Sequence, residues 1–318
     1  MNFGLQNPGC ELAPPEIAVL GSINEDFIIH KGKQKHSYGG ILYNLAALSV
    51  LLPNARITPL VFLGRNIWPK AGKFTHDLIN LDWNCAQKLK RKTNQVRLFY
   101  LPNGEKKEML KHPVPKFSWE DLRPALQADA ILLNFISGWE ISPRLFQNLR
   151  RKFPGAIHVD LHSLLLGIRK NGKRFRRVPR NWHFFLNADF VQMNQREWEL
   201  VANLPFNREN LLRFCKKWWR KKWKVILVTL AENGAVMAWR SGALKVISYP
   251  APKVKRSEQT GAGDFFAAGF LSALLEGKDP KAALQRAVRT ASWKCRYEGI
   301  ESVLKHKHEL KRFLTALK

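Results

Sequence analysis

Short apolar runs and longer helical patterns alternate along most of this 318-residue chain. The runs at 17–21, 130–135 and 225–230 read as buried strands, and amphipathic or apolar patterns of helical length stand between such runs. Strands that alternate with helices form a parallel sheet whose two faces are both covered. We therefore expect an α/β fold built on a mostly parallel central sheet with helices on both faces.

The remaining segments extend this pattern. Further strands are expected at residues 57–63, 157–161 and 190–193, and across a turn at 235–239 and 244–249. Helices are expected at 42–52, 69–81, 143–152, 196–202, 209–222, 265–276, 280–296 and 307–317. Two hairpin-like excursions, 26–38 and 95–111, do not fit the parallel rhythm, and the second contains an Asn-Gly pair typical of a hairpin turn. We expect them to form an accessory sheet, and we expect the stretch 167–182 to be irregular, basic and exposed.

The length is normal for one large α/β domain, and no internal repeat is visible, so we expect a single domain over 1–318 with flexible residues 1–15. The four cysteines lie far apart, with the spacing of neither a zinc site nor a disulfide framework. No apolar run approaches the roughly 20 residues that span a bilayer. The N-terminus lacks the charged start and apolar core of a secretory signal. A cytoplasmic protein with no membrane partner is the expectation.

The chain is strongly basic, with 53 Lys and Arg against 25 Asp and Glu and a formal net charge of +28. Such a field attracts anions and can bind nucleic acid non-specifically. Basic residues gather at 88–92, 169–180 and 216–224, and the last cluster contains Trp218, Trp219 and Trp223, which could stack on a single strand. The apolar residues of this segment also fall at helical spacing, which leaves the basic residues on a solvated face. We favour this second interpretation, so nucleic acid stays a distant third possibility.

Residues 260–264 carry the pattern with the most chemical content, Thr260-Gly261-Ala262-Gly263-Asp264, which leads into an apolar run. If a helix begins there, the amides of Gly261 to Gly263 are free and lie at the positive end of the helix dipole, where anions such as phosphate bind. A carboxylate beside such a site would repel a bound anion, so its presence needs a chemical explanation. Asp264 could be a general base that takes a proton from a hydroxyl as it attacks a phosphoryl group. The alternative is an ordinary helix start, with Asp264 stabilised by the dipole.

Polar residues also follow the first expected strand, at 21–26. Ligands of α/β sheets bind beyond the carboxyl ends of strands, and Asn24 and Asp26 can bind hydroxyl groups there. The same residue types favour a turn, and these residues leave the choice open. Further along, Gly39 and Gly40 allow a ligand close to the backbone, and Asn44 follows at the start of a helix.

These motifs, in this order from Gly21 to about Gly299, resemble those of the ribokinase, or PfkB-type, carbohydrate kinase family. Residues 260–264 resemble its C-terminal signature, which holds the catalytic aspartate. The resemblance implies a ribokinase-like fold with a small β-sheet lid made from the two excursions. It also implies transfer of the γ-phosphoryl group of ATP to a substrate hydroxyl, with Mg²⁺, with Asp264 as general base and with the amides of Gly261, Ala262 and Gly263 as anion hole.

The resemblance further assigns Asn24 and Asp26, with Gly39, Gly40 and Asn44 of the N-terminal signature, to the substrate. At 41–43 the chain has Ile-Leu-Tyr where ribokinase itself has Lys-Gly-Ala. If this bulkier and more apolar segment lines the substrate site, it puts plain ribose in doubt as the substrate. It would suit a substrate with a flat part, such as a nucleoside. Alternatively, these residues pack in the core. Sugar and nucleoside substrates both stay open.

On the nucleotide side, the resemblance implies Asn194, Thr229, Gly234 and Thr260 as binding residues, and Glu197 as a magnesium ligand, largely through water. Asn194 and Glu197 also fit an N-cap with its capping-box glutamate, and both roles can hold. Ala231 stands where the family usually has glycine.

Two further features are left open. Glu258 stands where many members have an aspartate near a monovalent-cation site, so potassium dependence stays an open question. Asp160 and His162 follow another strand near the same rim; Asp160 is a candidate site residue, whereas a lone histidine is more often structural.

A non-catalytic nucleotide- or sugar-binding relative is a rival interpretation, and the intact Asp264 and Gly-Ala-Gly segment argue against it. A homodimer also stays open, because an exposed lid edge would affect the oligomeric state.

Overall fold

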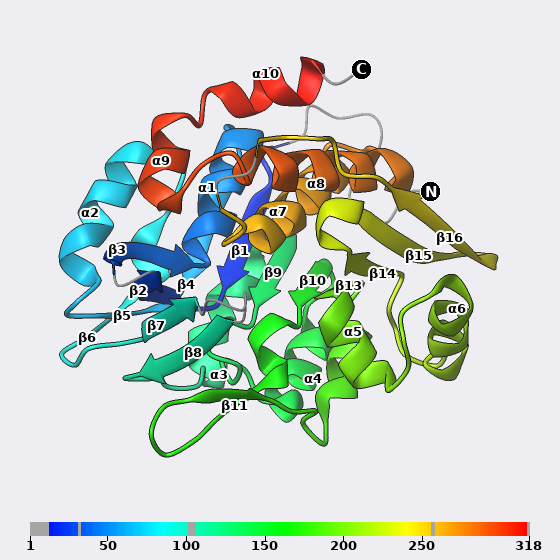
Figure 1. Ribbon diagram of the computed structural model, residues 1–318, viewed down its shortest axis with the longest axis horizontal. Helices are drawn as coiled ribbons and strands as arrows, with labels where there is room; N and C mark the ends of the chain where they lie inside the picture. Colours follow the sequence, from blue (N-terminus) through cyan, green and yellow to red (C-terminus); the bar gives the residue numbers. More distant parts are fainter. Residues whose placement is uncertain (1–12, 31–32, 101–105, 256–257, 317–318) are drawn as a thin grey trace.

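The computed structural model describes residues 13–30, 33–100, 106–255 and 258–316. Its main sheet has eight strands in the order β16-β15-β14-β13-β10-β9-β1-β4. Strands β14 to β4 of this order run parallel to one another, and β15 and β16 are antiparallel to their neighbours. The expected mostly parallel sheet is therefore confirmed (Figure 1).

The strands of this sheet are short and apolar. Their bounds are β1 (Glu16–Leu20), β4 (Arg56–Leu60), β9 (Ala130–Asn134), β10 (Ala156–Asp160), β13 (Phe190–Asn194), β14 (Val225–Thr229), β15 (Ala235–Ser241) and β16 (Ala243–Tyr249). Successive side chains of a strand point to opposite faces, so Ile17 and Val19 pack into one hydrophobic core and Ala18 and Leu20 into another. Because the central strands are buried on both faces, they are apolar throughout rather than alternating.

Helices cover both faces (Figure 1). The bounds are α1 (Leu42–Leu51), α2 (Trp68–Asp77), α3 (Trp119–Leu122), α4 (Pro143–Lys152), α5 (Gln195–Ala202), α6 (Arg208–Lys217), α7 (Ala262–Leu275), α8 (Pro280–Lys294), α9 (Gly299–Lys305) and α10 (Glu309–Ala316). Residues of α1, α2 and α7 to α10 pack on one face of the sheet, and residues of α3 to α6 pack on the other. Helix α7 is buried along almost its whole length, which fixes the position of its first turn relative to the sheet.

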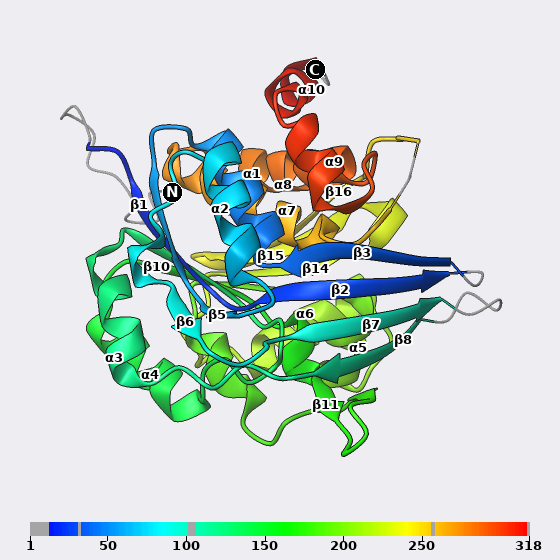
Figure 2. The same ribbon diagram turned by 90° about the vertical axis from the view of Figure 1, so that its left-hand side faces the viewer.

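A second sheet of four strands projects from one end of the main sheet (Figure 2). It consists of β2 (Ile23–His30), β3 (Lys33–Gly40), β7 (Gln95–Tyr100) and β8 (Lys106–Lys111), in the order β3-β2-β7-β8. The two excursions singled out from the sequence lie in this sheet, which is the small β-sheet lid of the expected fold. Val96, Leu98 and Leu110 form a small apolar cluster on it, against which Trp139 packs.

Some predicted elements differ from the structure. The expected strand at 57–63 is two strands, because β5 (Phe62–Gly64) leaves the main sheet to pair with β6 (Gln87–Leu89). The stretch 167–182 is not irregular: it contains the hairpin of β11 (Leu166–Ile168) and β12 (Arg174–Arg176), and its Arg174 is buried. Helix α9 was not predicted, because it spans only seven residues.

The expectation that residues 1–15 are flexible falls mainly on residues 1–12, which lie outside the described residues. Within the described ranges, none of the helices has both the length and the apolar character needed to cross a membrane.

Candidate active site

Polar residues end neighbouring strands of the main sheet at the same edge. Asn134, Asp160, Asn194 and Thr229 are the last residues of β9, β10, β13 and β14. In the strand register Asn134 lies beside Asp160, and Asn194 lies beside Thr229. Since ligands of such sheets bind beyond the carboxyl ends of the strands, this edge is the place to look for a site.

The first turn of α7 lies at this edge. Gly261 precedes the helix with φ +82°, a left-handed conformation that favours glycine. A Cβ atom at Gly261 would lie 2.5 Å from Cγ of Tyr43, so there is no room for a side chain. The ring of Tyr43 thus lies directly against the turn, and Asp264 follows in the first turn of the helix.

The three amides of the expected anion hole are not equivalent. The amide of Ala262 donates to the carbonyl of Gln259 at 3.1 Å, so it is already engaged. The amides of Gly261 and Gly263 have no acceptor within the described residues. A Cβ at Gly263 would lie 3.7 Å from Nε2 of Gln192 and 3.8 Å from Asp160 Oδ2, which is ordinary contact. The protein therefore does not crowd Gly263, and within the described residues its amide is left to donate to a ligand.

Two asparagines hold Asp264. Asn134 donates from Nδ2 to Oδ1 of Asp264, and the same nitrogen donates to Oδ1 of Asn44 at 2.9 Å. Asn44 in turn donates to the main-chain carbonyl of Asp264 at 2.9 Å. The structure thus brings Asn44 of the N-terminal motif to Asp264 of the C-terminal one. Asn134 was not singled out from the sequence, although a polar residue closing the apolar strand Ala-Ile-Leu-Leu-Asn was a usable signal.

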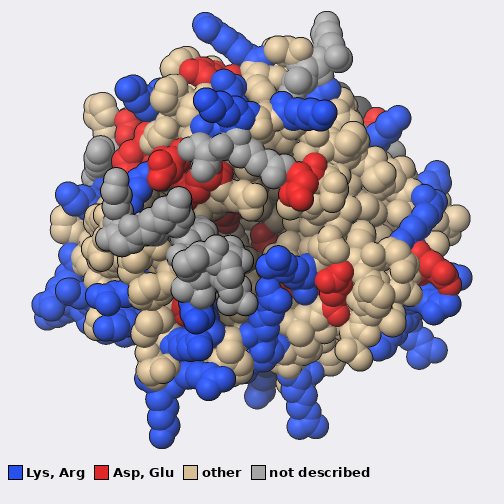
Figure 3. Space-filling model, viewed as in Figure 1, with Lys and Arg blue, Asp and Glu red and all other residues tan. Residues whose placement is uncertain are grey.

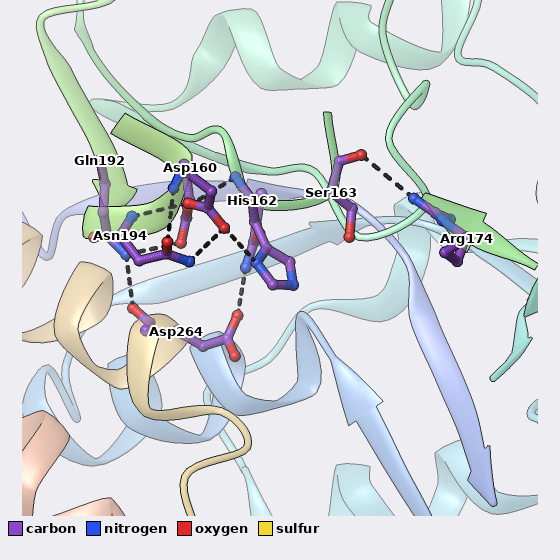
Figure 4. A network of polar contacts seen from close by, with 10 residues as sticks. Asp160, His162, Ser163, Arg174, Gln192, Asn194 and Asp264 are labelled. Atoms are coloured by element: carbon purple, nitrogen blue, oxygen red, sulfur yellow. Dashed lines mark hydrogen bonds and ion pairs between the residues drawn. The ribbon is translucent and has the colours of Figure 1, made fainter. Parts of the chain in front are cut away.

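A second carboxylate lies close by (Figure 4). Nε2 of Gln192 donates to Oδ2 of Asp160 at 2.7 Å and to the carbonyl of Gly263 at 3.0 Å. Gln192 therefore couples the end of β10 to the start of α7. His162 contacts Glu197 through Nδ1 at 3.3 Å, while Arg174 lies apart, on the far side of Ser163.

Burial and neighbouring groups have opposite effects on the pKa of Asp264. Burial raises the pKa of Asp264, while the positive charge of His162 and the hydrogen bond from Asn134 offset part of that rise. Burial and the neighbouring Glu197 raise the pKa of Asp160. The hydrogen bond and charge of Glu197, with the charges of Asp160 and Asp264, raise the pKa of His162 to about 9, although half of its side chain is exposed. The carboxyl groups of Asp160, Glu197 and Asp264 thus favour the protonated form of His162.

The predicted substrate residues form a neighbouring group. Asn24 and Asp26 lie on β2 and are mostly buried, and Asn24 accepts a hydrogen bond from Asn94 at 3.1 Å. A Cβ at Gly39 would lie 2.3 Å from Oδ2 of Asp26, so the glycine leaves room for this carboxylate. Gly40 has φ +67° and ends β3 immediately before α1.

A buried glutamate organises the adjoining loop. Glu140 is 1% exposed and accepts hydrogen bonds from the amides of residues 136–139 and from the hydroxyl of Ser22. Ser137 in this loop accepts from Asn94, which also holds Asn24. Sequence reasoning missed this network, because its members come from separate segments that only the fold brings together.

Residues 41–43 pack in the core. Ile41 and Leu42 are fully buried, and Tyr43 is 2% exposed. The ring of Tyr43 contacts Phe265 edge to face and lies against Gly261. The interpretation of this segment as an open apolar floor for a flat substrate therefore loses its support.

Asn194 and Glu197 form the capping box of α5. The Asn194 side chain accepts from the amide of Glu197 at 2.9 Å, and the Glu197 carboxylate accepts from the amide of Asn194 at 2.8 Å. Oε1 of Glu197 also accepts a hydrogen bond from Nδ2 of Asn194 and contacts Nδ1 of His162. Oε2 accepts the hydrogen bond from the main-chain amide of Asn194. The described residues contain no cluster of three or more metal-ligating side chains. Mg²⁺ keeps several waters and needs few protein oxygens, so the single carboxylate of Glu197 is compatible with the predicted role.

Of the remaining residues predicted to bind the nucleotide, Thr229 and Gly234 lie on either side of the turn after β14. Thr229 ends the strand and is partly exposed. Gly234 has φ +87°, and its Cβ would lie 2.0 Å from the carbonyl of Tyr249, so this buried glycine shapes the turn into β15. Ala231 adopts φ +50°, which explains why glycine suits that position. Thr260 is partly exposed and lies just before Gly261.

Glu258 pairs with a lysine. Its carboxylate accepts from the amide of Gly299 at 2.7 Å and lies 3.7 Å from Nζ of Lys294. Lys294, the last residue of α8, is completely buried.

The molecular surface agrees with this placement. Figure 3 shows a hollow near the middle of the face seen in Figure 1, with acidic side chains in its depth and Lys and Arg side chains along its lower margin. Basic residues beside a concave acidic centre attract an anionic ligand toward a carboxylate.

Part of the chain matches known carbohydrate kinases. The model of the pfkB family of carbohydrate kinases matches residues 182–307, which include Asn194, Glu197, Thr229 and Asp264. The resemblance to the ribokinase, or PfkB-type, family is confirmed. This ribokinase-like chain is 28% identical over 116 residues to a deoxyribokinase of Salmonella typhi, and 29% identical over 118 residues to a nucleoside kinase of Methanocaldococcus jannaschii. These matches cover 36% and 37% of this chain and 37% and 36% of the relatives, so the chain matches little more than a third of either curated relative.

Solved structures match the whole fold. A ribokinase of Arabidopsis thaliana in complex with ribose and ATP superposes with a TM-score of 0.72 at 19% identity, covering 95% of this chain and 99% of that one. A pyrophosphate-dependent kinase of the ribokinase family, in complex with a pyrophosphate analogue and myo-inositol, gives 0.72 at 22% identity, with coverage of 89% and 96%. The fold is therefore ribokinase-like.

Proposed function

We propose that this protein is an ATP-dependent kinase that transfers the γ-phosphoryl group to a hydroxyl of a sugar or sugar-like substrate. The observation that carries the proposal is Asp264, held by Asn134 and Asn44 at the start of α7, one residue after the uncrowded Gly263. A carboxylate next to an anion site is unfavourable unless it performs chemistry, and proton transfer from an attacking hydroxyl is that chemistry.

In this mechanism Asp264 accepts the proton of the substrate hydroxyl as the hydroxyl oxygen attacks the γ-phosphorus and the bond to the ADP oxygen breaks. The amides of Gly261 and Gly263 donate to the transferring phosphoryl group, and Ala262 contributes less, since its amide already donates to Gln259. Asn194, Thr229, Gly234 and Thr260 line the nucleotide side, where Gly234 acts by shaping the turn. Mg²⁺, when bound, neutralises phosphate charge, and Glu197 would hold it through water.

The substrate lies between the lid and α7 in this proposal. Asn24 and Asp26 bind its hydroxyl groups, and Gly39 and Gly40 let it approach the backbone. The burial of residues 41–43 removes the reason for preferring a flat substrate, so a sugar is favoured and a nucleoside is the alternative.

The test is ADP release with Mg-ATP across sugars, sugar phosphates and nucleosides, with pyrophosphate as a second donor monitored by phosphorylated product. Asp264→Asn should lower turnover by a factor on the order of 10²–10⁴, while ATP binding is spared, because the base is removed and the anion hole is kept. Asp77→Asn, at the end of α2, controls for the substitution itself. Normal turnover in Asp264→Asn would refute the assignment. If no acceptor in the panel yields ADP or phosphorylated product while ATP still binds, a regulatory, non-catalytic relative would be favoured.

A further inference from the structure

Lys294 has its amino group in a place where a positive charge is costly: burial lowers the pKa of Lys294, and the charge of Glu258 opposes that fall. Its side chain is completely buried at the end of α8. An ammonium group is expensive to remove from water, so its partners must offset the loss of hydration. The mechanism above gives this lysine no role.

The partners of Lys294 belong to the segment that leads into the anion hole. Nζ lies 3.7 Å from Oε2 of Glu258 and donates to the main-chain carbonyl of the same residue at 3.4 Å. The amide of Glu258 donates to the carbonyl of Cys295 at 3.3 Å, and its carboxylate accepts from Gly299. Residues 294–299 thus hold Glu258 through both its main chain and its side chain, three residues before Gly261.

A second route connects Lys294 to the same turn. Nζ lies over the ring of Tyr43, 5.3 Å from its centroid, within the range of a cation–π contact. The same ring lies against Gly261. The positive charge of Lys294 also acts on Asp264, where it opposes the rise in pKa caused by burial.

A carboxylate, a main-chain carbonyl and an aromatic face are groups that attract cations. Here they surround an ammonium group of the chain itself. We propose that Lys294 is a built-in cation that positions residues 258–263 beneath the transferring phosphoryl group, in the place of a bound monovalent ion. It is a positioning residue: it acts through Glu258 and Tyr43 and does not touch the reacting atoms.

The proposal predicts that the wild-type protein is indifferent to the monovalent cation, whereas a variant without the ammonium responds to one. In Lys294→Met the Glu258 carboxylate is left without its cation, so K⁺ or NH₄⁺ should raise the melting temperature relative to choline at equal ionic strength, as expected for a ligand that binds the folded state. In the double variant Lys294→Met, Glu258→Gln no carboxylate remains to be neutralised, and this response should disappear. Lys281→Met, which removes an exposed lysine from the same helix, is the matched control.

The activity readout rests on the proposed function. Lys294→Met should lower kcat by about 10- to 100-fold through displacement of the anion-hole turn, with a smaller change in KM for the acceptor, and K⁺ should restore part of kcat. If no phosphoryl transfer is found in the wild type, the proposed function fails, while the melting temperatures still decide the role of Lys294. The inference would be overturned if the melting temperature or activity of the wild type depended strongly on K⁺. It would also be overturned if K⁺ raised the melting temperature of Lys294→Met no more than that of Lys281→Met.

Discussion

Gly261 and Gly263 of the proposed anion hole differ in what a side chain would meet. Gly261 has φ +82° and no room for a Cβ against Tyr43, whereas a Cβ at Gly263 meets only ordinary contacts. Gly261→Ala should therefore lower the free energy of unfolding by about 1–3 kcal/mol. Gly263→Ala lies in a helix, where alanine is favoured, and should leave stability unchanged or raise it by up to about 1 kcal/mol.

Turnover should nevertheless fall in Gly263→Ala, by a factor on the order of 100, because the new methyl group stands beside the amide that the proposed function assigns to the phosphoryl group. Denaturant unfolding and kcat measured on the same preparations separate the two effects. Full turnover in Gly263→Ala would show that no phosphoryl group approaches this position.

His162 should set the acid limit of activity. Its positive charge lowers the pKa of Asp264, which burial raises. Asp264 works as a base when unprotonated, so activity is present above its pKa and is lost as the pH falls through it. Removing the cation in His162→Gln raises that pKa further, and the acid limb of the kcat/KM profile should move to higher pH. His308→Gln, an exposed histidine in the loop before α10, should leave the limb in place. A limb that stays or moves to lower pH in His162→Gln would contradict this arrangement.

At the scale of elements, strands and helices that are long and strongly apolar could be predicted from the sequence, because burial imposes its period directly. The strand ends and the start of α7 followed from the same patterns. The candidates Asp264 and Asn44, which the structure places together, came instead from Gly-rich motifs that resemble those of the ribokinase family. The short α9 and the split between β4 and β5, after Leu60, could not be predicted, since a few residues carry too little periodicity.

The supporting residues of the site were harder to find. Asn134, Gln192 and Lys294 act through partners far away in the sequence, as Glu140 does in its bond to Ser22, and the sequence does not contain that proximity. For the Ile-Leu-Tyr segment at 41–43 the sequence left a substrate contact and core packing both open, and the fold buries all three residues.

At the scale of the whole molecule, the charge of +28 calls for a test of polyanion binding. Trp223 is buried, and Trp218 packs against Trp182, which leaves Trp219, stacked on Arg240, as the exposed member of the basic aromatic cluster. Single-stranded DNA should therefore bind through charge with little stacking. Affinity should fall steeply with salt and be lost by about 200 mM NaCl. Fluorescence anisotropy of a labelled oligonucleotide measures this, and binding that survives such salt but is lost in Trp219→Ala would instead support a dedicated nucleic-acid site.

The lid sheet is held along both of its margins. At one margin Lys35 of β3 pairs with Glu298, just before α9, at 2.9 Å. At the other, the amide of Leu110 in β8 donates to the carbonyl of Gly172 in the β11–β12 hairpin at 2.9 Å. A rigid swing of the sheet away from α7 would have to break this main-chain hydrogen bond. Substrate entry by that route would thus be limited by the basic β11–β12 hairpin as much as by the lid sheet. A second copy of the chain that paired with the β8 edge of this sheet would find the edge already occupied at Leu110.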